Sequence, residues 1–558
     1  MDRKIELAEE LARRIFDGHL PSPDYIFNKY PKRGLGDERK VTRFAPSPTG
    51  FMHIGNLYSA MVSERVAHSS DGVFFLRIED TDEKREVAGA VDKIIDTLEY
   101  FAIKYDEGTN GGVDFGIYGP YVQSKRKLLY EVFAKILLEK GLAYPCFCSE
   151  EELEEIVASQ RKNGCKRLGY YGQWARYRNF SLEESIKKIE RGEKYTIRFK
   201  SPGDFDRKIV VHDVIRGKIE YPENDLDVVI LKKNLMPTYH FAHVVDDFLM
   251  GTNLVIRGDE WLPSLPIHLQ LFTAMGWKPP RYAHISPLMK IDGDAKRKLS
   301  KRKDPEANVD YFDKIGYPRD SVMEYLINIA NSSFENWSRQ NPDKHYREFP
   351  FDIRKMNISG ALFDFIKLNN ISRNVIGKMS AEEIYRNVLV WARKYDEDLA
   401  RIITENMEMA MKIFGIERDV NGKTRKDIAK WSEVRDEIIY FFELDKKIVK
   451  ASLASANKKD VAEIGRLFLE VYNDGDSKEE WFEKMKNIAS HCGYADNTRD
   501  FREQPGKFRG SISDITRIIR IILTGREHGP DLYSQMNIMG KNTVTQRVRD
   551  GISIAQTD

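Results

Sequence analysis

The sequence predicts an α/β region followed by an all-α region. Three observations lead to this fold class. Short apolar runs alternate with helical repeats from residue 41 to 142, short strands replace that alternation from 143 to 235, and β signals nearly vanish after Tyr311. Alternation of strands and helices on this scale is typical of parallel strands joined by crossover helices.

The chain begins with an extension, residues 1–40, and the first half of the α/β region follows at residues 41–142. The extension contains one helical pattern, which Pro21 and Pro23 close. Its apolar positions are Ala8, Leu11, Ala12, Ile15 and Phe16. The first half contains strand-like runs at 41–45 and 73–78 and helical repeats at 57–68, 91–101 and 128–140.

Residues 143–235 form an α+β insertion, and residues 236–325 form the second half of the α/β region. Short strands are expected at 194–199 and 208–211 in the insertion, and strand-like runs at 226–231 and 254–257. A helix is expected at 267–275.

The last 180 or so residues are predicted to be an all-α region. Four stretches have the period of helices with one buried face, namely 398–414, 434–444, 461–472 and 512–523.

Composition limits the class of protein. A chain of 558 residues with 41% hydrophobic and 32% charged residues is typical of a globular protein with several domains. No apolar run reaches the roughly 18 residues of a membrane span, and the N-terminus lacks an apolar signal core. Four cysteines argue against a disulfide framework, so a cytoplasmic protein without a membrane partner is expected.

Two short stretches indicate a triphosphate site. Residues 46–56 (PSPTGFMHIGN) follow a strand-like run and open a helix, which places backbone N–H groups where phosphate binds. His53 and Asn56 are three apart and can face one ligand. Residues 298–302 (KLSKR) form a basic loop whose lysines can neutralise charge that develops on phosphates. Taken alone, the first stretch could equally contain a structural histidine, and the second could equally be a solvated basic loop.

Residues 43–56 (RFAPSPTGFMHIGN) resemble the "HIGH" signature of class I aminoacyl-tRNA synthetases, in its bacterial-type glutamyl-tRNA synthetase form. Further matches follow in order at 76–82 (LRIEDTD), 237–243 (PTYHFAH), 245–247 (VDD), 255–261 (VIRGDEW), 298–302 and 522–526 (ILTGR). The resemblance implies a Rossmann-like catalytic domain in two halves, 41–142 and 236–325, with an acceptor-binding insertion at 143–235. It also implies a stem-contact helical domain at 326–385 and an anticodon-binding region at 386–558.

The resemblance assigns roles to individual residues. The catalytic positions are His53, Asn56, Lys298 and Lys301, and the ATP-binding positions are Gly55, Glu260, Met289, Ser300 and Lys301. Asn56 stands where the family often has a second histidine. Asparagine keeps a hydrogen-bond donor but carries no charge, so general acid chemistry is not expected there.

Recognition of glutamate requires a group that balances its side-chain carboxylate, and a guanidinium does so with two hydrogen bonds. Arg257 matches the family arginine for this carboxylate and favours glutamate over glutamine. The remaining glutamate-binding positions that the resemblance implies are Arg43, Ser47, Glu79, Tyr239 and His243. His243 departs from family members that have Asn at this position.

The resemblance implies ATP with Mg²⁺ as the nucleotide and no metal held by the protein alone. Cys146 and Cys148 resemble the first half of a zinc knuckle, but Trp174 stands where its last cysteine would be. Because structural zinc needs four ligands, two buried structural cysteines are the expected alternative.

The implied activity is that of a glutamate–tRNA ligase. The enzyme would convert L-glutamate and ATP to glutamyl-adenylate and transfer glutamate to the 3′-terminal adenosine of tRNA(Glu) as a monomer. The sequence leaves open whether tRNA(Gln) is also charged. Three alternatives remain. A tRNA-modifying glutamyl transferase would lack the long helical region, a glutaminyl enzyme would need another residue at Arg257, and a non-catalytic paralogue would have lost His53, Lys298 and Lys301.

Overall fold

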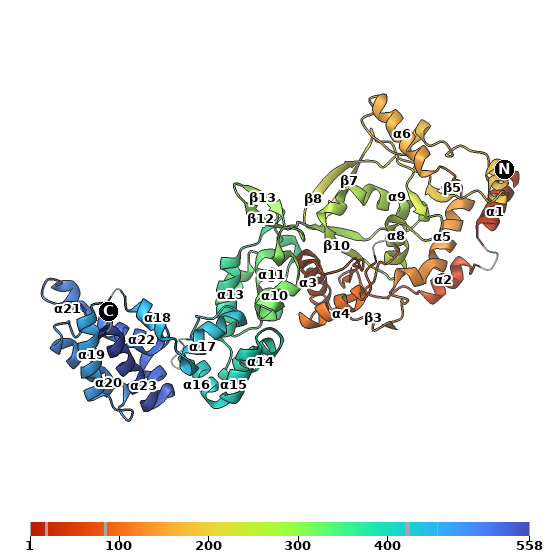
Figure 1. Ribbon diagram of the computed structural model, residues 1–558. Coiled ribbons are helices and arrows are strands. Elements are labelled where there is room, and N and C mark those ends of the chain that lie inside the picture. The colour runs from red at the N-terminus through yellow and green to blue at the C-terminus, as the bar shows by residue number, and fades with distance from the viewer. Residues whose placement is uncertain (1, 17–19, 83–85, 419–423, 455, 557–558) are drawn as a thin grey trace. The chain divides into compact units, whose positions relative to one another are not determined.

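The computed structural model of the protein describes residues 2–16, 20–82, 86–418, 424–454 and 456–556 (Figure 1). The chain divides into two compact units. Unit 1 comprises Met1–Tyr311 and Met323–Asp364, and unit 2 comprises Phe312–Val322 and Phe365–Asp558. No helix among the described residues is long and apolar enough to cross a membrane.

Parallel strands form the centre of unit 1. Strand β1 (Val41–Phe44) pairs with β2 (Val73–Leu76), and β10 (Leu254–Gly258) pairs with β11 (Arg281–Ile285). Asn253, which precedes β10, exchanges two hydrogen bonds with the backbone of the first residue of β1, 212 residues away in sequence. The two halves of the α/β region therefore meet along β1 and β10, as the sequence predicts.

Helices pack around these strands. They are α3 (Ile54–His68), α4 (Ala90–Tyr100), α5 (Lys127–Glu139), α8 (Tyr239–Leu249) and α9 (Leu265–Met275). Helix α3 contacts β1, β2 and β10, and it begins at Ile54 rather than at residue 57. Helix α8 is not among the predicted elements. Its residues are nearly all buried, so it shows no polar face in the sequence.

The N-terminal extension packs on this core. Helix α1 (Asp2–Ile15) matches the predicted helix, and a second helix, α2 (Pro23–Lys29), follows it. Pro23 stands in the first turn of α2, where its missing N–H is not needed, so this proline opens a helix, whereas α1 ends earlier, at Ile15. Leu11 and Ile26 are buried in the same apolar cluster as residues of α5 and α8.

The insertion contains an antiparallel sheet, two helices and a hairpin. The sheet has the order β5 (Ala143–Cys146), β6 (Thr196–Phe199), β9 (Val229–Leu231). The other elements are α6 (Glu150–Lys162), α7 (Leu182–Glu190), β7 (Lys208–Asp213) and β8 (Gly217–Pro222). Strand β8 was not predicted from the sequence, and its residues are exposed or half-buried.

Three further strands complete the described part of unit 1, beside the pair β3 (Gly108–Asn110) and β4 (Val113–Phe115). Strands β12 (Leu288–Asp292) and β13 (Ala295–Lys298) form an antiparallel hairpin, and β14 (Ala361–Leu362) pairs with β12 in parallel. The expected basic loop at 298–302 thus begins at the last residue of a strand. Short 3-10 helices in the chain span Gln123–Arg126, Gly172–Trp174, Asp259–Ser264, Pro305–Ala307, Tyr346–Glu348, Ile353–Lys355 and Trp431–Glu433.

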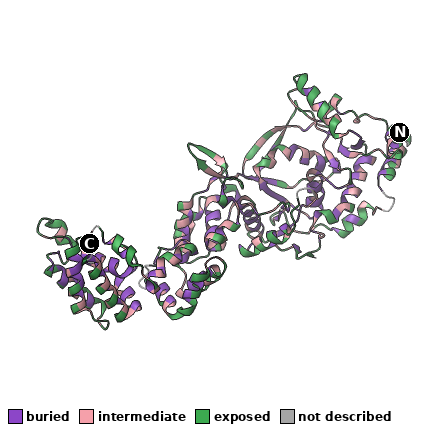
Figure 2. Cartoon of the chain, viewed as in Figure 1, coloured by how far each residue is buried: buried purple, intermediate pink, exposed green. Residues whose placement is uncertain are grey.

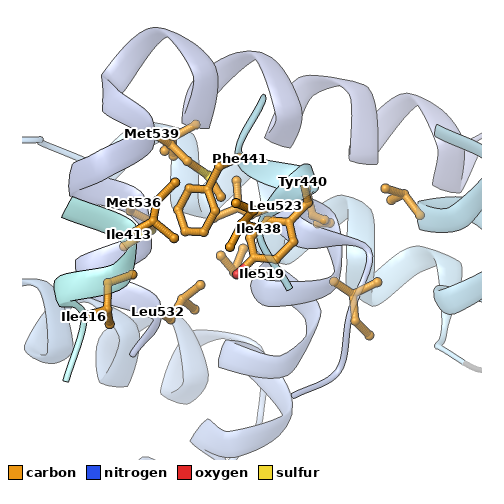
Figure 3. Packing of buried hydrophobic residues seen from close by; sticks show 14 of the residues in the cluster. Ile413, Ile416, Ile438, Tyr440, Phe441, Ile519, Leu523, Leu532, Met536 and Met539 are labelled. Atoms are coloured by element: carbon orange, nitrogen blue, oxygen red, sulfur yellow. The ribbon is translucent and has the colours of Figure 1, made fainter. Parts of the chain in front are cut away.

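The described residues from Asp310 onward are mainly helical; the longest interruption, 341–364, contains two short 3-10 helices and β14. The helices are α10 (Asp310–Ile315), α11 (Arg319–Ala330), α12 (Phe334–Gln340), α13 (Phe365–Gly377), α14 (Ala381–Tyr395), α15 (Glu397–Glu405), α16 (Met407–Gly415), α17 (Val434–Phe442), α18 (Lys446–Ser452), α19 (Lys458–Val471), α20 (Lys478–His491), α21 (Thr498–Glu503), α22 (Ile512–Thr524) and α23 (Leu532–Gln556). The buried residues of unit 2 lie on the inner faces of its helices (Figure 2), and side chains from α17, α22 and α23 point toward one another (Figure 3). The all-α prediction is confirmed.

The single repeat expected at 398–414 is two helices. Helix α15 ends before Asn406, and α16 begins after it. The Asn406 side chain donates a hydrogen bond to the Ile402 carbonyl oxygen at 2.9 Å, which satisfies one of the last carbonyls of α15. The apolar period continues through this break, so periodicity alone could not reveal it.

Candidate active site

A polar cavity of about 570 Å³ opens where β1 and β10 end and α3 begins. Ten of the predicted site residues line it: Arg43, Ser47, His53, Gly55, Asn56, Glu79, Tyr239, Arg257, Glu260 and Lys298. They come from both halves of the α/β region. A crevice at the carboxyl ends of parallel strands is a common location for ligand sites in such sheets.

His53 caps the N-terminus of α3. Its backbone is extended, and its Nδ1 accepts a hydrogen bond from the Gly55 N–H at 2.9 Å. Burial lowers the pKa of His53, and the nearby Lys301 lowers it further. The ring is therefore neutral at pH 7, and its proton lies on Nε2, since Nδ1 is an acceptor. His53 can donate one hydrogen bond from Nε2.

Gly55 approaches the His53 ring closely. A Cβ at this position would lie 3.0 Å from His53 Nδ1. The absence of a side chain therefore permits the cap, in addition to leaving room for a ligand along the backbone.

The basic segment after β13 lies at the same cavity. Lys298 Nζ is 3.6 Å from the Glu260 carboxylate, and both side chains are about half exposed. Lys301 Nζ donates to the Phe51 carbonyl oxygen in the first motif, and burial lowers the pKa of Lys301. Asp304 accepts hydrogen bonds from the Ser300 N–H at 2.9 Å and from Arg297 at 2.5 and 2.8 Å. The segment is thus held by its own ion pairs.

A balanced group of buried charges lies beneath the cavity. Arg77 Nη1 donates to Asp247 at 2.7 Å, and its Nη2 donates to Glu79 at 3.0 Å. Arg43 Nε lies 3.2 Å from the same Asp247 carboxylate. Burial raises the pKa of Glu79, although Arg77 and Arg43 oppose that shift. Burial also opposes ionisation of Asp247, but the two arginines hold its pKa well below the usual range.

Arg257, at the end of β10, has no such balance. Its Nε donates to His284 Nε2 at 3.0 Å, and its Nη1 lies 3.4 Å from the Tyr239 hydroxyl and 3.2 Å from His268 Nδ1. Its Nη2 is buried without a hydrogen-bond partner. Within the described part of the chain, no carboxylate forms an ion pair with Arg257. A buried guanidinium in this state is suited to an anionic ligand.

The four histidines around Arg257 carry no charge of their own at pH 7. Burial lowers the pKa of His240 to about 4 and that of His243 to about 3. It also lowers the pKa of His268 and His284. All four rings are neutral at pH 7, so the positive charge of Arg257 persists in the cavity wall.

Four predicted site residues do not line the cavity: His243, Met289, Ser300 and Lys301. His243 is fully buried behind Tyr239, and its two ring nitrogens face Asp247 at 2.7 Å and the Tyr282 hydroxyl at 3.2 Å. Met289 lies on β12, opposite Lys298 in the hairpin.

Other lining residues were not assigned from the sequence. Trp261 stacks near Tyr239 with ring centroids 4.2 Å apart, and Thr238 precedes α8. Both lie inside motifs of the sequence, 237–243 and 255–261, so the motifs could have identified them as lining residues. Lys232, which donates to the Thr81 carbonyl oxygen at 2.8 Å, lies outside every motif.

Cys146 and Cys148, two of the three cysteines in the insertion, face the same hydroxyl. The Tyr170 hydroxyl lies 3.4 Å from Cys146 Sγ and 3.6 Å from Cys148 Sγ, and it accepts the Tyr177 N–H at 3.0 Å. Among the described residues there is no group of three or more His, Cys, Asp or Glu side chains that could hold a metal ion.

Residues 40–339 match the family "tRNA synthetases class I (E and Q), catalytic domain", and residues 507–552 match "Anticodon binding domain". A glutamate–tRNA ligase of Clostridium perfringens (strain 13 / Type A) is 47% identical over 549 residues, which cover 97% of this chain and 100% of that protein. A glutamate–tRNA ligase of Acetivibrio thermocellus is 47% identical over 542 residues, with coverage of 97% and 99%. The crystal structure of a glutamate tRNA ligase from Elizabethkingia meningosepticum in complex with its amino acid aligns with a TM-score of 0.73 and 28% identity, covering 92% of this chain and 99% of that one.

Proposed function

The chain belongs to the class I tRNA synthetases of the glutamate and glutamine type and is a glutamate–tRNA ligase, and from this premise we propose how its cavity carries out the reaction. The enzyme activates L-glutamate with ATP and transfers it to tRNA(Glu). The family and the activity that the motifs predict are thereby confirmed.

The state of Arg257 carries our proposal for amino-acid recognition. Its guanidinium is buried, charged and without a carboxylate partner, and its Nη2 is unpartnered. The γ-carboxylate of glutamate would supply both the missing charge and the missing acceptor. The neutral amide of glutamine would supply an acceptor but leave the charge uncompensated, so glutamate is preferred.

The α-ammonium group of glutamate would face Glu79. This carboxylate lines the cavity and contacts Arg77, and burial raises its pKa. A second cation beside it would favour its ionised form, which stabilises the bound substrate. Arg43, Ser47 and Tyr239 line the same cavity. His243 would act by supporting Tyr239, against which its ring stacks.

The triphosphate of ATP would lie across the N-terminus of α3. The His53 Nε2–H, the Asn56 amide and the helix end all present donors or positive charge. Lys298 and Lys301 would stabilise the charge that develops on the α-phosphate and the departing pyrophosphate. Gly55, Glu260, Ser300 and the Met289 backbone would contact the rest of the nucleotide.

Mg²⁺ would arrive with the nucleotide and neutralise phosphate charge. Among the described residues, the carboxylates that line the cavity are Glu79, Asp82 and Glu260, and that of Glu260, about half exposed, already faces Lys298. One carboxylate together with phosphate and water oxygens suits Mg²⁺, which seldom uses an all-protein cage.

The two steps need no protein nucleophile. Glutamate held by Arg257 and Glu79 would attack the α-phosphorus of ATP, and the terminal adenosine of tRNA would then attack the adenylate. Positioning and electrostatics supply catalysis in such a site. We assign the acceptor end of the tRNA to residues 143–235, its stem to 326–385 and its anticodon to 386–558, where the match at 507–552 supports the last assignment.

We further propose a cytoplasmic monomer. Sedimentation of the purified chain measures the oligomeric state. Charging of separately purified tRNAs decides whether tRNA(Gln) is a second acceptor.

Substitution of Arg257 tests the proposal. Arg257→Gln should lower kcat/KM for glutamate by about 10²- to 10⁴-fold, because losing one partner of a buried ion pair costs about 3–5 kcal/mol. Arg257→Lys keeps the charge but loses the two-pronged geometry, so its kcat/KM for glutamate should lie between those of the wild type and Arg257→Gln. Thermal stability should not decrease in Arg257→Gln, since the free enzyme loses an uncompensated charge. An unchanged kcat/KM for glutamate in Arg257→Gln would overturn the assignment.

A further inference from the structure

A chain of buried hydrogen bonds fixes the orientation of Arg257 from outside the cavity. Its members are Asp213, at the end of β7, and His284, in β11. His284 Nδ1 lies 2.7 Å from Asp213 Oδ2, and His284 Nε2 accepts from Arg257 Nε at 3.0 Å. Neither Asp213 nor His284 lines the cavity.

Asp213 is held as an anion. Its two oxygens accept four hydrogen bonds, from the His284 ring, the His284 N–H at 3.0 Å, the Ile215 N–H at 2.9 Å and the Arg216 N–H at 3.0 Å. Burial opposes its ionisation, but these hydrogen bonds keep the pKa of Asp213 below its usual range. A neutral amide could not accept all four.

The anion determines which nitrogen of His284 carries the proton. Asp213 can only accept, so the proton of the neutral ring lies on Nδ1 and leaves a lone pair on Nε2. That lone pair accepts from Arg257 Nε. The guanidinium cannot then rotate about its Cδ–Nε bond without losing this contact, and its Nη groups face Tyr239, His268 and the cavity side.

We propose that Asp213 and His284 are positioning residues that hold the Arg257 guanidinium in the plane required for a γ-carboxylate and thereby set the preference for glutamate over glutamine. This inference rests on the proposed role of Arg257. Because Asp213 belongs to the hairpin of β7 and β8, the insertion would also contribute to the amino-acid specificity of the α/β domain.

The same contacts could in principle serve only to attach the hairpin to β11. The Val214 N–H donates to the Tyr282 carbonyl oxygen at 2.8 Å, and Arg216 Nε donates to the His284 carbonyl oxygen at 3.1 Å. A purely structural role would change stability and leave substrate preference alone. The decisive readout is therefore the ratio of kcat/KM for glutamate to kcat/KM for glutamine.

Two substitutions at His284 separate these roles. His284→Phe keeps the ring but removes both nitrogens, and His284→Gln retains an oxygen that can accept from Arg257 Nε. At saturating ATP and tRNA, His284→Phe should raise KM for glutamate about tenfold to hundredfold and lower the glutamate-to-glutamine ratio by a similar factor. His284→Gln should remain within about threefold of the wild type, and KM for ATP should change less than about twofold in both.

Val211→Ala is the matched control for attachment of the hairpin. Val211 lies on β7 and packs against Val255 and Tyr282, but it makes no contact with the Asp213–His284–Arg257 chain through a polar atom. It should lower the melting temperature and leave the glutamate-to-glutamine ratio unchanged. Asp213→Asn, measured in the same assay, should lower the ratio.

The inference is overturned if folded His284→Phe keeps the wild-type ratio, or if Val211→Ala shifts the ratio as much as His284→Phe does. Arg257→Gln, assayed in parallel, tells the two proposals apart. If Arg257→Gln loses the preference for glutamate and His284→Phe does not, only the positioning role is wrong. If Arg257→Gln keeps the preference, the role of Arg257 itself is wrong.

Discussion

The cavity of unit 1 and the helical core of unit 2 bury opposite kinds of side chains. Arg43 and Arg257, in the cavity wall, and Asp247, next to Arg43, are almost completely buried. In unit 2, Phe441 and Ile519 lie in an apolar cluster (Figure 3). Burying charge costs free energy of folding, whereas burying apolar surface supplies it. The buried charges at the cavity therefore lower the stability of the fold but hold the site residues in place. The apolar core of unit 2 raises stability and takes no part in the reaction.

The largest effect should come from removing the charge that two arginines share. Asp247→Asn leaves Arg43 and Arg77 buried without their common carboxylate and should lower the free energy of unfolding by about 3–5 kcal/mol. The depressed pKa of Asp247 means that its contribution is complete above the unfolded value of about 4 and is lost as pH falls below it. Denaturant unfolding of the wild type and Asp247→Asn should show a smaller difference in the free energy of unfolding at pH 3 than at pH 7.

In the apolar region, Ile519→Ala should lower the free energy of unfolding by about 2–5 kcal/mol, because it leaves a cavity among α17, α22 and α23. KM for glutamate and for ATP should be unchanged. Val390→Ala, at a residue 71% exposed on α14, is the control and should change stability by less than about 0.5 kcal/mol. A raised KM for glutamate in Ile519→Ala would contradict the separation of the two regions.

Lys301→Ala should leave stability nearly unchanged and lower kcat for adenylate formation by about 10²- to 10³-fold, as loss of a group aimed at transition-state charge does. Lys135→Ala on α5, where the lysine faces Glu139 at 3.8 Å, is the control. Pyrophosphate exchange in the presence of tRNA measures both. Intact exchange in Lys301→Ala would rule out its catalytic role.

The smallest effect should come from Glu79→Gln. Burial raises the pKa of Glu79 and so offsets part of the free energy of its ion pair with Arg77, so Glu79→Gln should lower stability by less than Asp247→Asn does. KM for glutamate should rise about tenfold, which corresponds to about 1.4 kcal/mol. A destabilised Glu79→Gln with normal KM would place Glu79 among the structural ion pairs instead.

The motifs of the sequence predicted most of the cavity because its lining lies at strand ends and helix starts. His53 immediately precedes α3, Glu79 follows β2, and Arg257 lies at the end of β10, and the period of each of these elements is visible in the sequence. The roles of all the predicted site residues stay predictions, and His243, Met289, Ser300 and Lys301 in addition lie outside the cavity lining.

The groups that orient these residues could not be predicted in the same way. Asp213 and His284 are 71 residues apart in sequence, and their contact depends on how the insertion packs against β11. Neither residue stands in a motif, and a buried histidine has no periodic signature. The break at Asn406 was hidden for a related reason, because the apolar repeat continues across it.

Charging of separately purified tRNA(Glu) and tRNA(Gln) with labelled glutamate and, in parallel, labelled glutamine tests the central claim most directly. The account predicts that glutamate is attached to tRNA(Glu) in an ATP-dependent reaction and that glutamine is attached to neither tRNA. Attachment of glutamine, or failure to charge tRNA(Glu) with glutamate, would contradict it.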